Sequence, residues 1–102
     1  MMNFREVELG QALPSVIIAA PTVSSSAGRL LEQFVRGWAG VEAVLEKVSV
    51  TWHPPAHGAG DLQLAGQVYG RHMDGSGCVE IRVTGRDDHG DRLAGMVRVK
   101  LA

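Results

Sequence analysis

Apolar residues recur at the helical period in one segment of the chain, Ser24 to Gly40. Polar and charged residues separate them, so the segment predicts an amphipathic helix with one solvent-exposed face. The apolar positions are Leu30, Leu31, Phe34, Val35 and Trp38. Serines at the start favour capping of the first free backbone N–H groups, and Gly37 and Gly40 favour termination. We therefore expect the other elements to be arranged around this helix.

Elsewhere apolar positions alternate at the period of a strand. A short apolar run at 15–20 precedes the helix, and four longer runs follow it at 41–52, 62–72, 78–86 and 92–102. Glycine-containing polar turns at 74–77 and 87–91 separate the last three runs. We expect the four later strands to form an antiparallel meander, whose single apolar face the helix covers.

The alternation also assigns side chains to faces. In the long strand after the helix, one face holds Val44, Glu46, Val48, Val50 and Trp52. In the last two strands the expected inward positions are Val79, Ile81, Val83, Leu93, Val97, Val99 and Leu101. Cys78 precedes Val79 and is expected on the opposite face, where no neighbouring base or cation in sequence supports a reactive thiol. Gly66 and Gly70 indicate bending or close approach by another backbone.

Composition limits the class of protein. A chain of 102 residues with 45% hydrophobic content predicts one domain over residues 1–102, small enough for a partner subunit to contribute to its stability. The net charge of −1 and a pI near 6.4 argue against nucleic-acid binding, and no apolar run reaches membrane-spanning length. A single cysteine and an N-terminal sequence without a signal-peptide core predict a cytoplasmic protein. The sequence has no cluster of cysteine, histidine and carboxylate residues at the spacing of metal ligands, so we do not expect a metal site.

Three stretches resemble the MaoC-like (R)-specific enoyl-CoA hydratase family. The first is VSVTWHPPAHGAGDLQLAGQV, in which Pro54, Pro55, Gly60 and Asp61 occupy the family's proline corner and Gly-Asp pair. The others are FVRGWAGVEAVLEKVSV and EIRVTGRDDHGDRLAGMVRVKL. The chain is most similar to the small subunit of heteromeric members that act on steroid side-chain CoA thioesters. The resemblance implies an α+β hot-dog fold, an antiparallel sheet wrapped around one central helix.

Catalytic members of that family carry an aspartate and a histidine in the loop between the first strand and the central helix, where they activate a water. This sequence has only Pro21, Thr22 and Val23 there, so no catalytic residue is carried over. Two explanations stay open. The chain lacks the loop and completes a partner's tunnel, or residues between Val23 and Ser24 are missing from this sequence.

The candidate substrate-binding residues are Ser25, Ser26 and Gly28, at the start of the predicted helix. They have a capping role, and the free N–H groups and positive dipole end also suit a thioester oxygen. The four histidines and Asp61 are expected in surface loops or local backbone hydrogen bonds. Trp38 and Trp52 are expected as core or interface anchors.

The resemblance implies a subunit of an enoyl-CoA hydratase that binds an acyl-CoA thioester beside a second hot-dog subunit, in a homo-oligomer or a hetero-oligomer. It implies no cofactor, since CoA is part of the substrate, and neither nucleic acid nor membrane as a partner. The alternative is a non-catalytic hot-dog scaffold that binds the thioester for a catalytic partner. A thioesterase ranks lower, because Glu32 lies a turn too far from the helix start.

Overall fold

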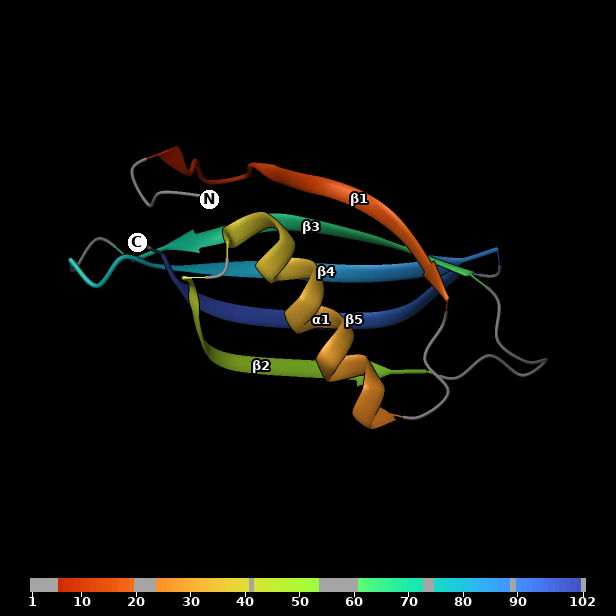
Figure 1. Cartoon of the computed structure of the whole chain (residues 1–102). Coiled ribbons are helices and arrows are strands. Elements are labelled where there is room, and N and C mark those ends of the chain that lie inside the picture. Colours follow the sequence, from red (N-terminus) through yellow and green to blue (C-terminus); the bar gives the residue numbers. More distant parts are fainter. Residues whose placement is uncertain are drawn as a thin grey trace.

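The computed structural model describes residues 6–19, 24–40, 42–53, 61–72, 75–88 and 90–101, with only the backbone of residues 24 and 25. Within these ranges the chain forms one helix and five strands, joined in a single antiparallel sheet of order β1-β3-β4-β5-β2 (Figure 1). The elements are β1 (Ala12–Ala19), α1 (Ser24–Ala39), β2 (Val44–Trp52), β3 (Asp61–Arg71), β4 (Cys78–Asp87) and β5 (Gly90–Lys100). The helix crosses one face of the sheet (Figure 1).

The expected meander holds for β3, β4 and β5 but is wrong for β2. That strand pairs with β5, from Val44 opposite Lys100 to Trp52 opposite Leu93. Both neighbours of β3 are taken, because β1 pairs along one side of it and β4 along the other. After α1 the chain therefore enters the sheet at the edge opposite β1, so that β1 and β2 are the two edge strands.

The helix lies where the sequence predicts it. One row of side chains is fully buried against the sheet, Ala27, Leu31, Val35 and Ala39, each at most 1% exposed. A second row, Leu30, Phe34 and Trp38, is only partly buried. The helix ends at Ala39 and is followed by Gly40, whose φ of +98° suits glycine and whose N–H donates to the Arg36 carbonyl at 2.9 Å.

A bulge in β2 changes the face that each side chain takes. The pairing register with β5 shifts between Leu45 and Lys47, so Leu45 and Val48 both lie against the core. Val44 is 55% exposed, and Glu46 contacts Cys78 on the other side of the sheet. The expectation that Val44 and Glu46 share the core face is therefore wrong, because strict alternation fails where an extra residue enters the strand.

The other strands follow the predicted alternation closely. All seven expected inward residues of the last two strands are buried. Gly75, Gly77 and Gly90 have positive φ at the two predicted turns. β1 begins three residues earlier than predicted and contains a register shift between Leu13 and Val16, around Pro14. Among the described residues, no helix is long and apolar enough to cross a membrane.

Candidate functional site

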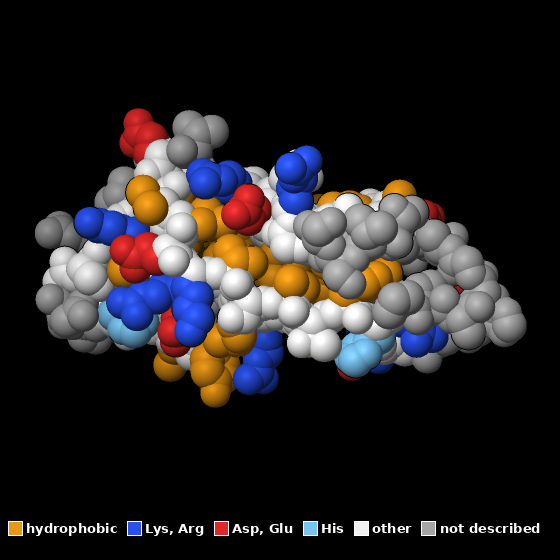
Figure 2. Space-filling view, turned by 90° about the horizontal axis from the view of Figure 1, so that it is seen from below, with side chains coloured by type: hydrophobic (Ala, Val, Ile, Leu, Met, Phe, Trp, Pro, Cys, Tyr) orange, Lys and Arg blue, Asp and Glu red, His pale blue; other side chains and the backbone are white. Residues whose placement is uncertain are grey.

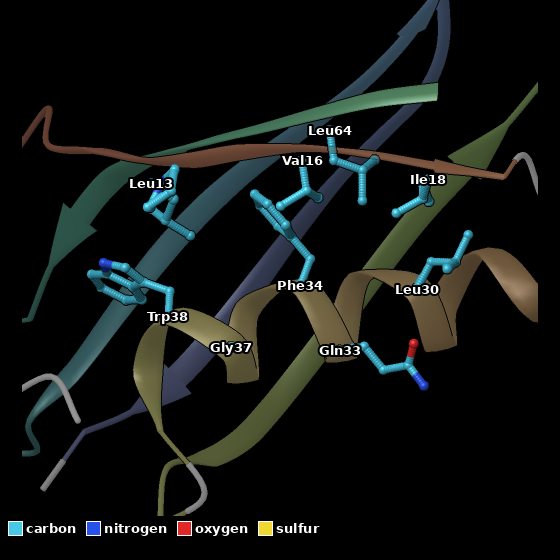
Figure 3. A pocket seen from close by; sticks show the side chains of 10 residues that line it. Leu13, Val16, Ile18, Leu30, Gln33, Phe34, Gly37, Trp38 and Leu64 are labelled. Atoms are coloured by element: carbon cyan, nitrogen blue, oxygen red, sulfur yellow. The ribbon is translucent and has the colours of Figure 1, made fainter. Parts of the chain in front are cut away.

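A cavity of about 390 Å³ lies between α1 and the edge strand β1 (Figure 3). Its walls are two facing rows of apolar side chains. From β1 come Leu13, Pro14, Val16 and Ile18, and from α1 come Leu30, Gln33, Phe34, Gly37 and Trp38, with Leu64 of β3 as the floor. Along the cavity, Ile18 lies near Leu30, Val16 near Phe34, and Leu13 near Trp38 (Figure 3). The cavity is therefore an elongated slot parallel to the helix.

The slot results from where the helix sits on the sheet. α1 packs on β2 and β5, at one side of the sheet, rather than over its middle. Its fully buried row faces the sheet directly, and its second row is turned toward β1. Because β1 is an edge strand at the opposite side of the sheet, the two rows face each other without closing together. Val16 remains 41% exposed although it points toward the helix.

The lining is suited to an apolar ligand and offers no acid or base. Among the described lining residues only Gln33 has a polar side chain, and its amide points away from β1 (Figure 3). A pocket of this size with an almost wholly apolar lining is typical of sites that hold hydrocarbon groups by burial alone. Any polar group of a ligand must therefore lie at an end of the slot rather than inside it.

The sequence-predicted binding residues lie just before this slot. Ser26 is half-buried in the first turn of α1, and the side chain of Ser25 is outside the described part of the structure. Gly28 faces β2, because a Cβ added to it would meet Val50 at 4.0 Å. At about 1.5 Å per residue, the helix start lies roughly one turn from Leu30. The serines and Gly28 stay predictions for the polar end of a ligand.

The remaining candidates are scattered. His53 and Asp61 are exposed, and His57 and His89 lie outside the described residues. His72 lies 3.8 Å from a carboxylate oxygen of Glu80. Within the described ranges no three residues among histidine, cysteine, aspartate and glutamate are grouped to hold a metal ion.

Cys78 lies on the outer face, as its alternation with Val79 predicts, but it is only 1% exposed. Its Sγ donates to Glu46 Oε1 at 3.2 Å, and the same oxygen lies 3.2 Å from Arg98 Nε. The contact with Cys78, followed by the carboxylates of Glu46 and Glu80, raises the pKa of Arg98 above its ordinary value. The guanidinium is charged at neutral pH, as arginine ordinarily is, and the cluster joins β2, β4 and β5 outside the slot.

Sequence reasoning did not identify the slot, since it interpreted Leu30, Phe34 and Trp38 as one apolar stripe with Leu31 and Val35. Such a stripe is wide enough to bury two rows, and only one of them is fully buried. The width of the stripe therefore indicates that a second apolar row of the helix is available to line a site. The position of β1 relative to the second row was not available from the sequence.

No family model matches the chain, and a search of curated proteins gives no match. Solved structures do match it. A chain of the ChsH1-ChsH2 complex from Mycobacterium tuberculosis aligns with a TM-score of 0.79 at 16% identity, over 94% of this chain and 99% of that one. The R-hydratase PhaJ1 from Pseudomonas aeruginosa aligns with a TM-score of 0.78 at 11% identity, over 97% of this chain and 84% of that one.

A third match is the (R)-hydratase from A. caviae involved in PHA biosynthesis, with a TM-score of 0.68 at 12% identity, over 96% of this chain and 99% of that one. A hot-dog-like protein from Thermanaerovibrio acidaminovorans also matches, with a TM-score of 0.65 at 18% identity, over 97% of this chain and 87% of that one. The chain therefore has the hot-dog fold and resembles hydratases in structure. At these identities the likeness concerns the fold alone.

Proposed function

We propose that this chain is a subunit of a MaoC-like enoyl-CoA hydratase and holds the acyl part of a CoA thioester in the slot between α1 and β1. The observation that supports this proposal is the slot itself, an apolar cavity of about 390 Å³ in a hot-dog fold. A fatty acyl chain or a steroid side chain has the apolar surface that such a lining buries favourably. The thioester lies at the start of α1, where the first turn presents free backbone N–H groups and the positive end of the helix dipole, and Ser25, Ser26 and Gly28 stay the candidate residues for binding it.

The proposed partner is a second hot-dog subunit, joined through the free edge of β2. This edge carries no proline among residues 44–52, whereas β1 carries Pro14 and a register shift at its own edge. Exposed Val44 and the partly buried Val48, Val50 and Trp52 line β2. Figure 2, which looks onto the β2 side, shows apolar side chains in a band with charged side chains beside it. A paired edge satisfies the unpaired backbone groups of β2.

The second candidate is a non-catalytic role, in which this chain shapes the pocket and the partner supplies the acid and base. The observation that favours it is the absence of any titratable side chain among the described residues of the slot lining. Addition of water to an enoyl thioester requires a base near the double bond. In this version of the proposal, the aspartate and histidine come from the partner subunit.

The test is hydration of a model substrate, octenoyl-CoA, monitored as the disappearance of the double bond that is conjugated to the thioester. The chain is assayed alone and after mixing with a candidate partner, a second hot-dog protein that carries the family's aspartate and histidine. We expect hydration only in the mixture, and we expect it to survive replacement of every histidine of this chain by glutamine. Activity of this chain alone that disappears with one of those replacements would place the catalytic group here. Failure of both samples to bind or hydrate the thioester would remove the proposal.

A further inference from the structure

The ring of Phe34 spans the depth of the slot from the helix to the sheet. A Cβ added to Gly66 of β3 would lie 2.9 Å from Phe34 Cε2 and 3.2 Å from Leu13 Cδ2. Both distances are shorter than ordinary contacts, so the ring tip and the leucine methyl rest on the bare backbone of Gly66. Only glycine at position 66 lets the aromatic ring reach this far. The close approach predicted for this glycine is made by side chains rather than by another backbone.

This contact lies partway along the slot, which has lining residues on both sides of the ring. Ile18 and Leu30 lie on the side of Phe34 nearer the helix start, and Leu13 and Trp38 lie on the side nearer the helix end (Figure 3). Gly37, one turn beyond Phe34, also lines the second part and fills none of it, since a Cβ there would meet nothing within 4 Å. The cavity therefore continues beyond the ring, between Leu13 and Trp38.

We propose that Phe34, seated on Gly66, sets the length of the apolar chain that the slot accepts. The inference rests on the proposed function, because it takes an acyl chain that enters from the helix start as the occupant. The part of the slot before the ring receives the first methylenes of that chain. The ring stops longer chains from reaching the part beside Leu13 and Trp38. Phe34 is thus a specificity-determining residue, and Gly66 positions it.

The test uses saturated acyl-CoA thioesters of increasing length, from butanoyl- to hexadecanoyl-CoA, titrated by calorimetry into the full chain, alone and mixed with the candidate partner. Each methylene that becomes buried in an apolar site raises affinity about fourfold. For the wild type we expect this rise to continue with chain length and then to level off where the chain meets Phe34. The length at which it levels off is the measured quantity.

Two substitutions should move that length in opposite directions. Phe34→Ala removes the ring and should shift the plateau to chains longer by two carbons or more. Gly66→Ala displaces the ring into the slot and should shift the plateau to shorter chains. Leu45→Ala is the matched control, because Leu45 packs against the same core from β2 and does not line the slot. It should leave the plateau length unchanged.

The outcomes separate this inference from the proposed function. Saturable binding with the same plateau length in the wild type, Phe34→Ala and Gly66→Ala would overturn the role of Phe34 while leaving the acyl site in place. Failure of every thioester to bind the wild type would overturn the proposed function itself. If Phe34→Ala does not give a folded chain by circular dichroism, Phe34→Leu replaces it, and a plateau that does not lengthen in that variant counts against the inference.

Discussion

Gly95 lies where the helix approaches the sheet closely. A Cβ added there would overlap a methyl group of Leu31, which is fully buried in α1, and would lie 2.7 Å from the backbone oxygen of Ser49 in β2. The leucine has packed neighbours around it, and the Ser49 oxygen belongs to the sheet backbone, so neither yields freely. Because the side chain of Gly95 is only a hydrogen atom, Leu31 can pack into this part of the core.

We therefore expect Gly95→Ala to destabilise the chain by about 1–3 kcal/mol through overpacking. The measurement is the free energy of unfolding in urea, compared with the wild type. Gly37→Ala is the matched control, since a Cβ at position 37 meets nothing within 4 Å. In the helix interior that change should stabilise by about 0.5–1 kcal/mol. Equal effects of the two alanines would contradict the packing assigned to Gly95.

The sequence does not distinguish the crowded position of Gly95 from the open position of Gly37. Alternation places residue 95 on the inward face of its strand and helical periodicity places residue 37 near the helix end, but the space beside each depends on which element lies across from it. Gly66 shows the same limit. Its strand position predicts close approach, and only the assembled structure identifies the ring of Phe34 as the group that approaches.

At the scale of elements, periodicity predicted the helix and strand boundaries well, and bulges are the main departures. The predicted helix from Ser24 to Gly40 differs from α1 by one residue. In β2 the extra residue turns Glu46 to the outer face, where its carboxylate contacts the Cys78 thiol and Arg98. The bulge therefore has a local consequence, because it covers a cysteine that alternation alone leaves on the exposed face.

Glu46→Ala should uncover that thiol. We expect Cys78 to react several-fold faster with a disulfide reagent such as dithionitrobenzoate, because access limits the reaction of a buried thiol. The free energy of unfolding should fall only slightly, since the ion pair with Arg98 is partly exposed. Glu80→Ala, on the same outer face, is the control and should leave the reaction rate near that of the wild type. An unchanged rate in Glu46→Ala would show that other groups cover the thiol.

At the scale of the whole molecule, the fold is elongated, with extents of 46 × 22 × 19 Å, and the described residues form one sheet and one helix. Its two edge strands differ. β1 carries Pro14 and borders the slot, and β2 presents a regular backbone from Lys47 to Trp52. A second hot-dog subunit that pairs with β2 would extend the sheet and leave the slot accessible from the β1 side.

The paired edge makes a testable prediction about association. Ser49 and Thr51 are exposed on the outer face of β2, and residues facing each other across paired strands lie about 4.5–5.5 Å apart. The double change Ser49→Glu and Thr51→Glu should therefore weaken pairing at this edge, through like-charge repulsion where the partner is a second copy of this chain, measured as the mass of the chain by light scattering after size exclusion. Ser15→Glu, at the exposed edge strand β1, is the control and should leave the mass unchanged. The reverse pattern would assign the interface to β1.

The sequence by itself determined the kinds of element, their order and most of the inward faces, because the periods of helix and strand are properties of the local backbone. It also predicted the hot-dog fold that the solved structures support. Only the tertiary structure decided that β2 pairs with β5, that Leu45 replaces Val44 against the core, and that the helix leaves a slot beside β1. These features depend on which side chains compete for the same space across the fold, and no local pattern records that competition.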